Sequence, residues 1–340
     1  MIHLRIVAPE EVAHHALELL CESPAVMNVV HLHAASHKPP GDVILCDVVR
    51  EEASVILADL KELEIPRVGS ISLEHVDTTI SDAAVKAERD APGLPSDAVV
   101  WEEVQQRTSE ETELSISFVT FMVLAMQIAV VGILFDQPIL IVGAMVVGPE
   151  FGPLAGLSVA LVHRQHDLAR RSMRALAVGF PVGIAFALLS VAIFRWTGLM
   201  SDYTPSDDAI TGFIAQPDFF SFFIAYVAGT AGMLSLTNAK SGALIGVLIS
   251  VTTIPAAANI GVGVAYTNWD EATGAAGQLA INLTSIVLAG VITLFIQRSY
   301  YVARRRKHLS DPARSAAGLP VGHSTHPHKK PHARDPLQPR

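Results

Sequence analysis

Residues 143–153 read GAMVVGPEFGP, and this stretch decides how the chain is organised. It lies at the middle of an apolar segment, 139–163, that is long enough to cross a bilayer. Pro149 and Pro153 cannot continue a regular helix, and Glu150 is an ionisable group at the centre of the span. Where the backbone is unwound inside a membrane, its N–H and C=O groups must form hydrogen bonds with protein or water. The stretch therefore predicts a broken transmembrane helix that does not face lipid.

The composition of the whole chain points to a membrane protein. Of its 340 residues, 50% are hydrophobic and 17% are charged, and the mean hydropathy is +0.40. Charged residues crowd 1–112 and 300–340, whereas long stretches between them carry almost none. The net charge of −9 argues against a nucleic-acid partner, since no basic face is available to neutralise phosphates.

The apolar segments predict about six membrane-spanning helices in a lipid bilayer. We place the spans at 113–135, 139–163, 173–197, 217–236, 241–265 and 275–297. Lys and Arg cluster after the second and sixth spans, whereas Asp and Glu fill the loops on the other side. Since basic loops stay inside, we expect both termini in the cytosol and the chain in the cell inner (plasma) membrane. Residues 1–24 also lack the pattern of a signal peptide.

The N-terminal residues 1–80 alternate between strand and helix patterns. Strand-like runs lie at 3–7, 26–33, 42–49 and 69–76, and helical spacing lies at 9–20 and 51–63. The order βαββαβ predicts a ferredoxin-like cytosolic domain. The fold class is therefore α+β, with an all-α membrane domain at 113–298. The small domain either binds a regulatory ligand or holds the subunits of a homo-oligomer together, and the second role is favoured. Cys21 and Cys46 lack zinc-site spacing, so no metal or cofactor is expected.

Two segments flank the membrane domain. Residues 81–112 predict a linker rich in Ala, Asp, Pro and Gly, followed by an amphipathic helix. Trp101 on that helix either anchors at the membrane interface or packs on the N-terminal domain. Residues 299–340 are basic at first and then Pro- and His-rich, which is typical of a disordered tail.

The membrane half resembles two copies of one pattern. Gly143 and Gly246 open similar small-residue runs 103 residues apart, and Pro153 and Pro255 lie 102 apart. Each copy contains three spans. Because three is odd, the second copy must enter the membrane from the opposite side, which predicts a 3+3 inverted repeat.

The second copy carries a matching break at Thr252-Thr253-Ile254-Pro255. A helix is expected to begin again near each proline, and Pro255 suits the first turn of such a helix. The free N–H groups of two such helix starts favour an anion at the midplane. Glu150 would repel that anion unless a proton or cation neutralises it. The expected substrate-binding residues are Gly148, Glu150, Gly152, Thr252, Thr253, Asn259 and Asn282. Two alternatives stay open, in which the prolines only kink the helices and Glu150 only caps a helix start.

The run 143–153 and the run AGMLSLT at 231–237, followed by SGALIGV at 241–247, are similar to the DUF389 family of bacterial multispan membrane proteins. The similarity covers roughly 113–298. Many members of that family read SPLMGP where this chain has GPEFGP at 148–153, so the resemblance assigns no family-wide role to Glu150. The family is defined as a domain of unknown function, and the resemblance implies a membrane protein without naming a substrate.

These features together predict a secondary transporter or channel-like permease for a small solute or ion. An anionic solute with proton or cation coupling is favoured. The alternative is a membrane-anchored sensor or scaffold that acts through its N-terminal domain. An enzyme is not expected, because the sequence offers no nucleophile–base set, metal-ligand spacing or phosphate-binding loop.

Overall fold

The computed structural model describes residues 1–76, 78–91, 98–200, 212–238, 253–310, 314 and 317–320. The chain divides into two compact units, and each is described by itself. The first unit comprises Met1–Pro92 and Tyr300–Arg340, and the second comprises Gly93–Ser299.

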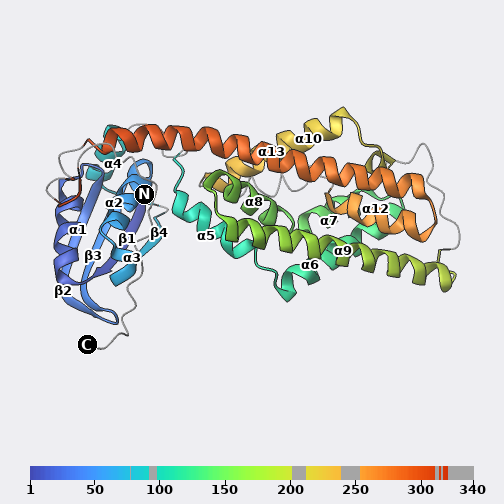
Figure 1. Ribbon diagram of the computed structural model, residues 1–340, viewed down its shortest axis with the longest axis horizontal. Coiled ribbons are helices and arrows are strands. Elements are labelled where there is room, and N and C mark those ends of the chain that lie inside the picture. The colour runs from blue at the N-terminus through green and yellow to red at the C-terminus, as the bar shows by residue number, and fades with distance from the viewer. Residues whose placement is uncertain are drawn as a thin grey trace, which may run out of the picture. The chain divides into compact units, whose positions relative to one another are not determined.

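The first unit is built on a small antiparallel sheet (Figure 1). Its elements in chain order are β1 (Ile2–Ala8), α1 (Glu10–Glu22), β2 (Val26–His37), β3 (Pro40–Val48), α2 (Arg50–Glu62), α3 (Ile65–Val68), β4 (Ser70–His75) and α4 (Asp82–Asp90). The four strands lie in the order β2-β3-β1-β4, and each neighbouring pair is antiparallel. The sheet joins strands that are far apart in the chain.

The core of the first unit follows from the alternation of apolar residues along the strands. Ile2, Leu4 and Ile6 are buried on one face of β1, whereas Arg5 is exposed on the other. Helices α1 and α2 bury further apolar side chains, among them Ala13, Ala16, Leu20, Val55, Ile56 and Leu60. Burial of each aliphatic side chain of Leu or Ile size stabilises the fold by about 1.5–3 kcal/mol relative to leaving that side chain in water. The period-two pattern therefore places one face of the sheet in the core.

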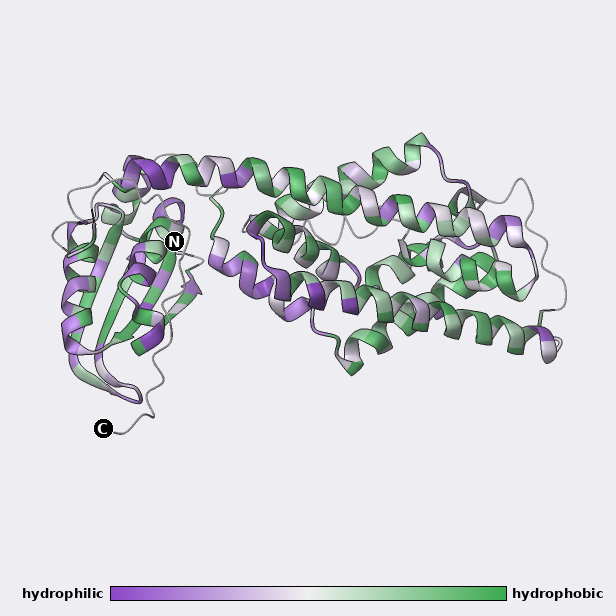
Figure 2. Cartoon of the chain, viewed as in Figure 1, coloured by the Kyte–Doolittle hydropathy of each residue, from purple (hydrophilic) through white to green (hydrophobic). Residues whose placement is uncertain are grey.

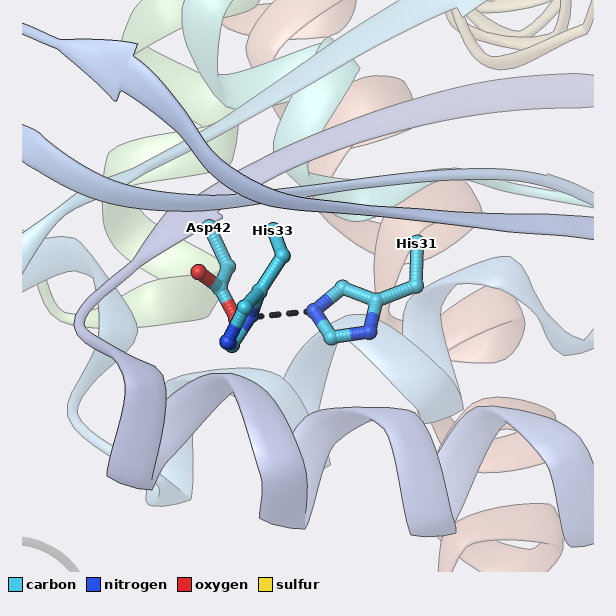
Figure 3. A group of neighbouring side chains, drawn as sticks. All are labelled: His31, His33 and Asp42. Carbon is cyan, nitrogen blue, oxygen red and sulfur yellow. Dashed lines mark hydrogen bonds and ion pairs between the residues drawn. The ribbon is translucent and has the colours of Figure 1, made fainter.

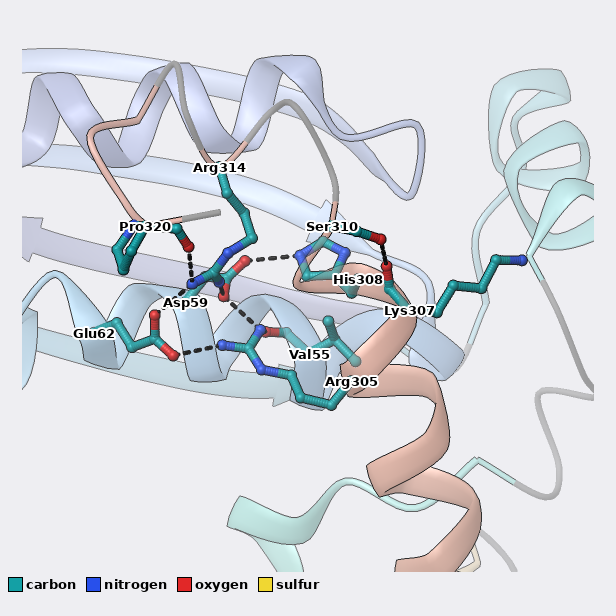
Figure 4. Close-up of polar contacts among 9 residues, drawn as sticks. All are labelled: Val55, Asp59, Glu62, Arg305, Lys307, His308, Ser310, Arg314 and Pro320. Atoms are coloured by element: carbon teal, nitrogen blue, oxygen red, sulfur yellow. Dashed lines mark hydrogen bonds and ion pairs between the residues drawn. The ribbon is translucent and has the colours of Figure 1, made fainter. Parts of the chain in front are cut away.

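Part of the expected tail is ordered, whereas residues 311–313, 315–316 and 321–340 lie outside the described residues. Helix α13 (Trp269–His308) continues well past the sixth expected span, and Arg314 is only 1% exposed. The carboxylate of Asp59 on α2 accepts hydrogen bonds from Arg305, Arg314 and His308, with the His308 bond at 2.7 Å. Figure 4 shows these side chains converging on Asp59. Ion pairs with α2 thus hold residues for which composition predicted disorder.

The expected linker also contains regular structure. Helix α4 belongs to the first unit. Ser81 is its N-cap, and the Ser81 hydroxyl accepts a hydrogen bond from the Ala84 N–H. Helix α5 (Trp101–Glu111) belongs to the second unit, as the amphipathic pattern predicts. Trp101 is buried there, with its ring centroid 4.9 Å from that of His163. Trp101 therefore packs within the second unit, which neither alternative foresaw.

The second unit is mostly helical. Besides α5 and α13 it contains α6 (Ile116–Leu134), α7 (Pro138–Val147), α8 (Phe151–His163), α9 (His166–Trp196), the 3-10 turn η2 (Gly212–Ala215), α10 (Phe219–Thr237) and α12 (Thr253–Ala265). Figure 2 shows hydrophobic residues along most of these helices and hydrophilic ones at the C-terminal end of α13.

Several of these helices are long and apolar enough to span a membrane. Among the described residues, α6, α9, α10 and α13 qualify alone, and the bent pair α7–α8 adds a fifth candidate. Helix α12 is shorter, and the first part of the fifth expected span, 241–252, lies outside the described residues. Such helices indicate a multispan membrane protein.

The helix boundaries recur along the chain at a nearly constant offset. The starts of α6 and α10 lie 103 residues apart, those of α8 and α12 lie 102 apart, and those of α9 and α13 lie 103 apart. The turns that follow α8 and α12 also match, because Arg164 and Thr267 have φ values of 56° and 58°. In both turns the next residue donates its N–H to the carbonyl five positions earlier, at 2.9 and 2.8 Å.

Candidate functional site

The second expected span is broken in the structure. Helix α7 ends at Val147 and α8 begins at Phe151, and the two helices are bent by 51°. The broken helix expected at 139–163 is thus observed, and its break lies at the Gly-Pro-Glu residues 148–150.

Both prolines lie in the first turn of a helix. Pro153 is the third residue of α8, and Pro255 is the third residue of α12. The first-turn position expected for Pro255 is confirmed, whereas α8 begins two residues before Pro153 and not after it. The physical reason is that the N–H groups of a first helical turn have no intrahelical partner, so a proline there removes no hydrogen bond.

Glu150 is a buried acid at this break. Its residue is 5% exposed, and the hydroxyl of Thr253, itself 1% exposed, donates a hydrogen bond of 2.5 Å to Glu150 Oε1. Glu150 Oε2 has no hydrogen-bond partner among the described residues, and none of those residues forms an ion pair with it. Burying a carboxyl group that has one oxygen without a hydrogen bond and no opposite charge nearby lowers the free energy of unfolding.

The capping alternative for Glu150 does not describe this geometry. Glu150 occupies the position before the first residue of α8, but its side chain makes no capping hydrogen bond to that helix. The carboxyl group instead bonds to Thr253, at the first residue of α12. The break between α7 and α8 and the start of α12 therefore touch through these two side chains, which lie 103 positions apart in the chain.

The two glycines expected at the site have different neighbours. A Cβ atom added to Gly148 would lie 2.4 Å from Glu150 Oε2 and 2.6 Å from Ile254 Cγ1, so any larger residue would force the side chains of Glu150 and Ile254 to shift. A Cβ atom added to Gly152 would meet Glu111 Cβ at 2.7 Å instead. Gly148 therefore lies where the end of α7 meets the start of α12, whereas Gly152 packs against the end of α5.

The two asparagines form polar pairs with residues of α13. Asn259, 2% exposed and roughly 9 Å along α12 from Thr253, bonds through its side chain to Glu271. Gln278 Nε2 donates to Asn282 Oδ1 at 3.4 Å, and both residues are buried. The oxygens Asn259 Oδ1 and Gln278 Oε1 have no partner among the described residues.

The structure thus brings Gly148, Glu150 and Thr253 together, while Asn259 and Asn282 belong to two separate polar pairs, with Glu271 and with Gln278. Thr252 lies outside the described residues. The sequence prediction did not include Gln278. The spacing of four residues between Gln278 and Asn282 places both amides on one helix face and was an available signal.

Comparisons with known proteins address the membrane region. Residues 145–288 match the family described as a domain of unknown function, DUF389. This region resembles the DUF389 family. The DUF389 match includes Glu150, Thr253, Asn259 and Asn282, and it confirms the resemblance expected from the sequence.

The chain also has a distant relative of uncharacterized function. The chain is 26% identical over 194 residues to an uncharacterized protein of Methanocaldococcus jannaschii. The alignment covers 57% of this chain and 58% of that relative, so the chain spans less than two thirds of the relative's length. No solved structure matches the chain. Neither DUF389 nor this relative carries an assigned function.

Proposed function

We propose that the chain is a secondary transporter or channel-like permease for a small solute, with an anion favoured and with proton or cation coupling. The observation that carries this proposal is the buried contact between Glu150 and Thr253, which joins the break between α7 and α8 to the start of α12. An acid inside a membrane protein costs at least ~2.5 kcal/mol on insertion scales. Anchoring a soluble domain requires no such group.

The proposal includes a 3+3 inverted repeat. The recurring helix boundaries support it, since three spans per copy require the second copy to run in the opposite direction. Glu150 directly precedes the first residue of α8 and Thr253 is the first residue of α12, so the two lie within one position of equivalent places in the two copies. In transporters with such repeats, substrate and coupling-ion sites lie where the broken helices of the two copies meet.

The starts of α8 and α12 explain the preference for an anion. Each presents first-turn N–H groups without intrahelical partners, and a helix start favours negative charge. The Thr253 hydroxyl adds a hydrogen-bonding group at the start of α12. Because an ionised Glu150 would oppose an anionic solute, a proton or a cation must neutralise the carboxylate when that solute binds. Solute and coupling charge would then enter and leave the site together.

The first unit completes the proposal. Apart from the short helix α3 and the added helix α4, its elements follow the order βαββαβ, and this order and the strand order β2-β3-β1-β4 support a ferredoxin-like domain. We assign this domain and both termini to the cytosol, the membrane half to the inner (plasma) membrane, and the assembly to a homo-oligomer. The alternative remains a membrane-anchored sensor or scaffold, in which the first unit acts and the helices only anchor it.

A flux screen separates these two functions. The purified chain would be reconstituted into liposomes and tested with small anions and cations under imposed pH and sodium gradients. A transporter is expected to move at least one solute faster than protein-free liposomes do, with a rate that depends on one gradient. Flux at the protein-free rate for every solute tested would favour the sensor or scaffold.

Equivalent residues of the two copies offer a test of the inverted repeat. Asp167 and Asp270 are both exposed, follow matching turns and lie 103 residues apart. In a background with Cys21→Ser and Cys46→Ala, we expect Asp270→Cys to react with an impermeant maleimide on intact cells. Asp167→Cys is expected to react only after the cells are opened. Labelling of both variants from the same side would contradict the inverted repeat.

A further inference from the structure

A cluster of two histidines and one aspartate lies on the sheet of the first unit, in a region that the transport proposal does not use. His31 Nε2 lies 2.8 Å and His33 Nδ1 lies 3.0 Å from the same carboxylate oxygen, Asp42 Oδ2. One ligand atom from each residue lies within 4.8 Å of the other two. Figure 3 shows the three side chains converging on one side of the sheet.

The strand geometry explains why these residues meet. His31 and His33 are two positions apart on β2, so their side chains leave the same face of the strand. Leu32 pairs with Val43 on β3, which brings Asp42 beside His33. A register shift then begins between Leu32 and Ser36. Such an irregularity redirects side chains locally.

The carboxylate is held in place by the backbone of this irregular segment. The Ala34 N–H donates a 2.8 Å hydrogen bond to Asp42 Oδ1, and Ala34 has a φ of 47°. That bond leaves Oδ2 directed at the two imidazoles. The Ala34 hydrogen bond and the neighbouring histidines lower the pKa of Asp42 to about 2, so its carboxyl group is ionised at neutral pH.

The three groups form a ligand set that suits zinc. Two imidazole nitrogens and a carboxylate oxygen are common Zn²⁺ ligands, and a water molecule can complete a tetrahedron. Ligands of a tetrahedral Zn²⁺ lie roughly 3.3 Å apart. An ion therefore requires each imidazole nitrogen to move from Asp42 Oδ2 by a few tenths of an ångström, and the two imidazole nitrogens, which lie within 4.8 Å of each other, to take up the same spacing. The other ring nitrogen of His33 lies 3.6 Å from Glu10 Oε1. Metal-bound histidines commonly have such a carboxylate on their second nitrogen.

The exposure of the three side chains allows a metal ion to reach them from solvent. The side chains of His31 and His33 are 31% and 65% exposed, whereas that of Asp42 is 4% exposed. An ion can therefore reach the imidazoles from solvent while the carboxylate stays rigid. We propose that His31, His33 and Asp42 bind one Zn²⁺ ion or a chemically similar divalent transition metal. The competing explanation is a set of ordinary His–Asp hydrogen bonds that hold the hairpin.

The test uses the full chain, purified in detergent without a polyhistidine tag. Adventitious binding by the C-terminal tail is removed in a background where four histidines are replaced by Gln: His323, His326, His328 and His332. After treatment with a chelator, Zn²⁺ is titrated by calorimetry. Co²⁺ is then added as a spectroscopic probe of coordination. The expected result is one Zn²⁺ per chain and the intense visible absorption of four-coordinate Co²⁺.

Single substitutions identify the ligands. His31→Gln and His33→Gln are expected to weaken Zn²⁺ binding by at least about 100-fold, and Glu10→Gln, which alters only a supporting contact, by about 10-fold. His37→Gln, on the same strand but outside the cluster, is the matched control and should bind Zn²⁺ like the parent. Circular dichroism checks that the sheet is retained, which matters most for Asp42→Asn because Asp42 also holds Ala34.

Two results would overturn the assignment. One is the absence of a stoichiometric Zn²⁺ site in the parent, which would leave the cluster as a set of hydrogen bonds. The other is unchanged Zn²⁺ affinity in both His31→Gln and His33→Gln, which would place the bound ion elsewhere. Neither result depends on transport activity, so the metal site and the transport proposal fail or succeed separately.

Discussion

Replacing Glu150 by Gln is expected to abolish the dependence of flux on pH or on the coupling cation. Glutamine has nearly the same size, and its side-chain oxygen can still accept the hydrogen bond from Thr253, but it cannot take up a proton or balance a cation. The parent rate should change by about tenfold per pH unit where one proton controls transport. The variant rate should change less than about twofold over the same range. The measurement is solute flux in proteoliposomes at a series of pH values and sodium concentrations.

The controls for this prediction separate coupling from folding. Glu113→Gln alters an exposed carboxyl group of the same unit and should leave the pH profile unchanged. Membrane insertion and the elution profile in detergent should be the same for parent, Glu150→Gln and Glu113→Gln. If Glu150→Gln transports with parental coupling, Glu150 has a structural role and the proposed mechanism is wrong.

Replacing Asp59 by Ala is expected to release the C-terminal segment from α2. Asp59 is fully buried, and it accepts from Arg305, Arg314 and His308. Without its carboxylate, the side chain of the buried Arg314 keeps, among the described residues, the partners Glu62, at 2.6 Å, and the Pro320 carbonyl. Removing one partner of a buried ion pair destabilises the folded state by about 3–5 kcal/mol. We therefore expect trypsin to cleave after Arg314 at least about 100-fold faster, as followed by mass spectrometry of the intact chain.

Glu62→Gln provides the matched comparison. Its side chain is 37% exposed and also contacts Arg305 and Arg314, but Asp59 remains in place. Water screens this more exposed pair, so the rate of cleavage should rise by less than about tenfold. If Asp59→Ala and the parent are cleaved at equal rates, contacts other than the Asp59 ion pairs hold the segment.

The sequence by itself determined the features that depend on local pattern. The alternation of Ile2, Leu4 and Ile6 predicted a strand with one buried face, and the order of strands and helices followed from similar runs. The lengths of the apolar segments predicted membrane helices, and the Pro and Gly residues at 148–153 predicted a break within the second of them, which the structure places at 148–150. Periodicity, span length and helix-breaking residues are short-range properties, so they can be read from neighbouring positions.

Only the tertiary structure decided which distant residues meet. It placed Glu150 against Thr253 and turned Gly152 toward α5. It also joined Asp59 to Arg314 across 255 positions in a segment whose composition predicted disorder. A one-residue change in strand register or a small rotation of a helix would separate such pairs without altering any local pattern. Contacts of this kind depend on how whole elements pack, and packing is a property of the complete fold.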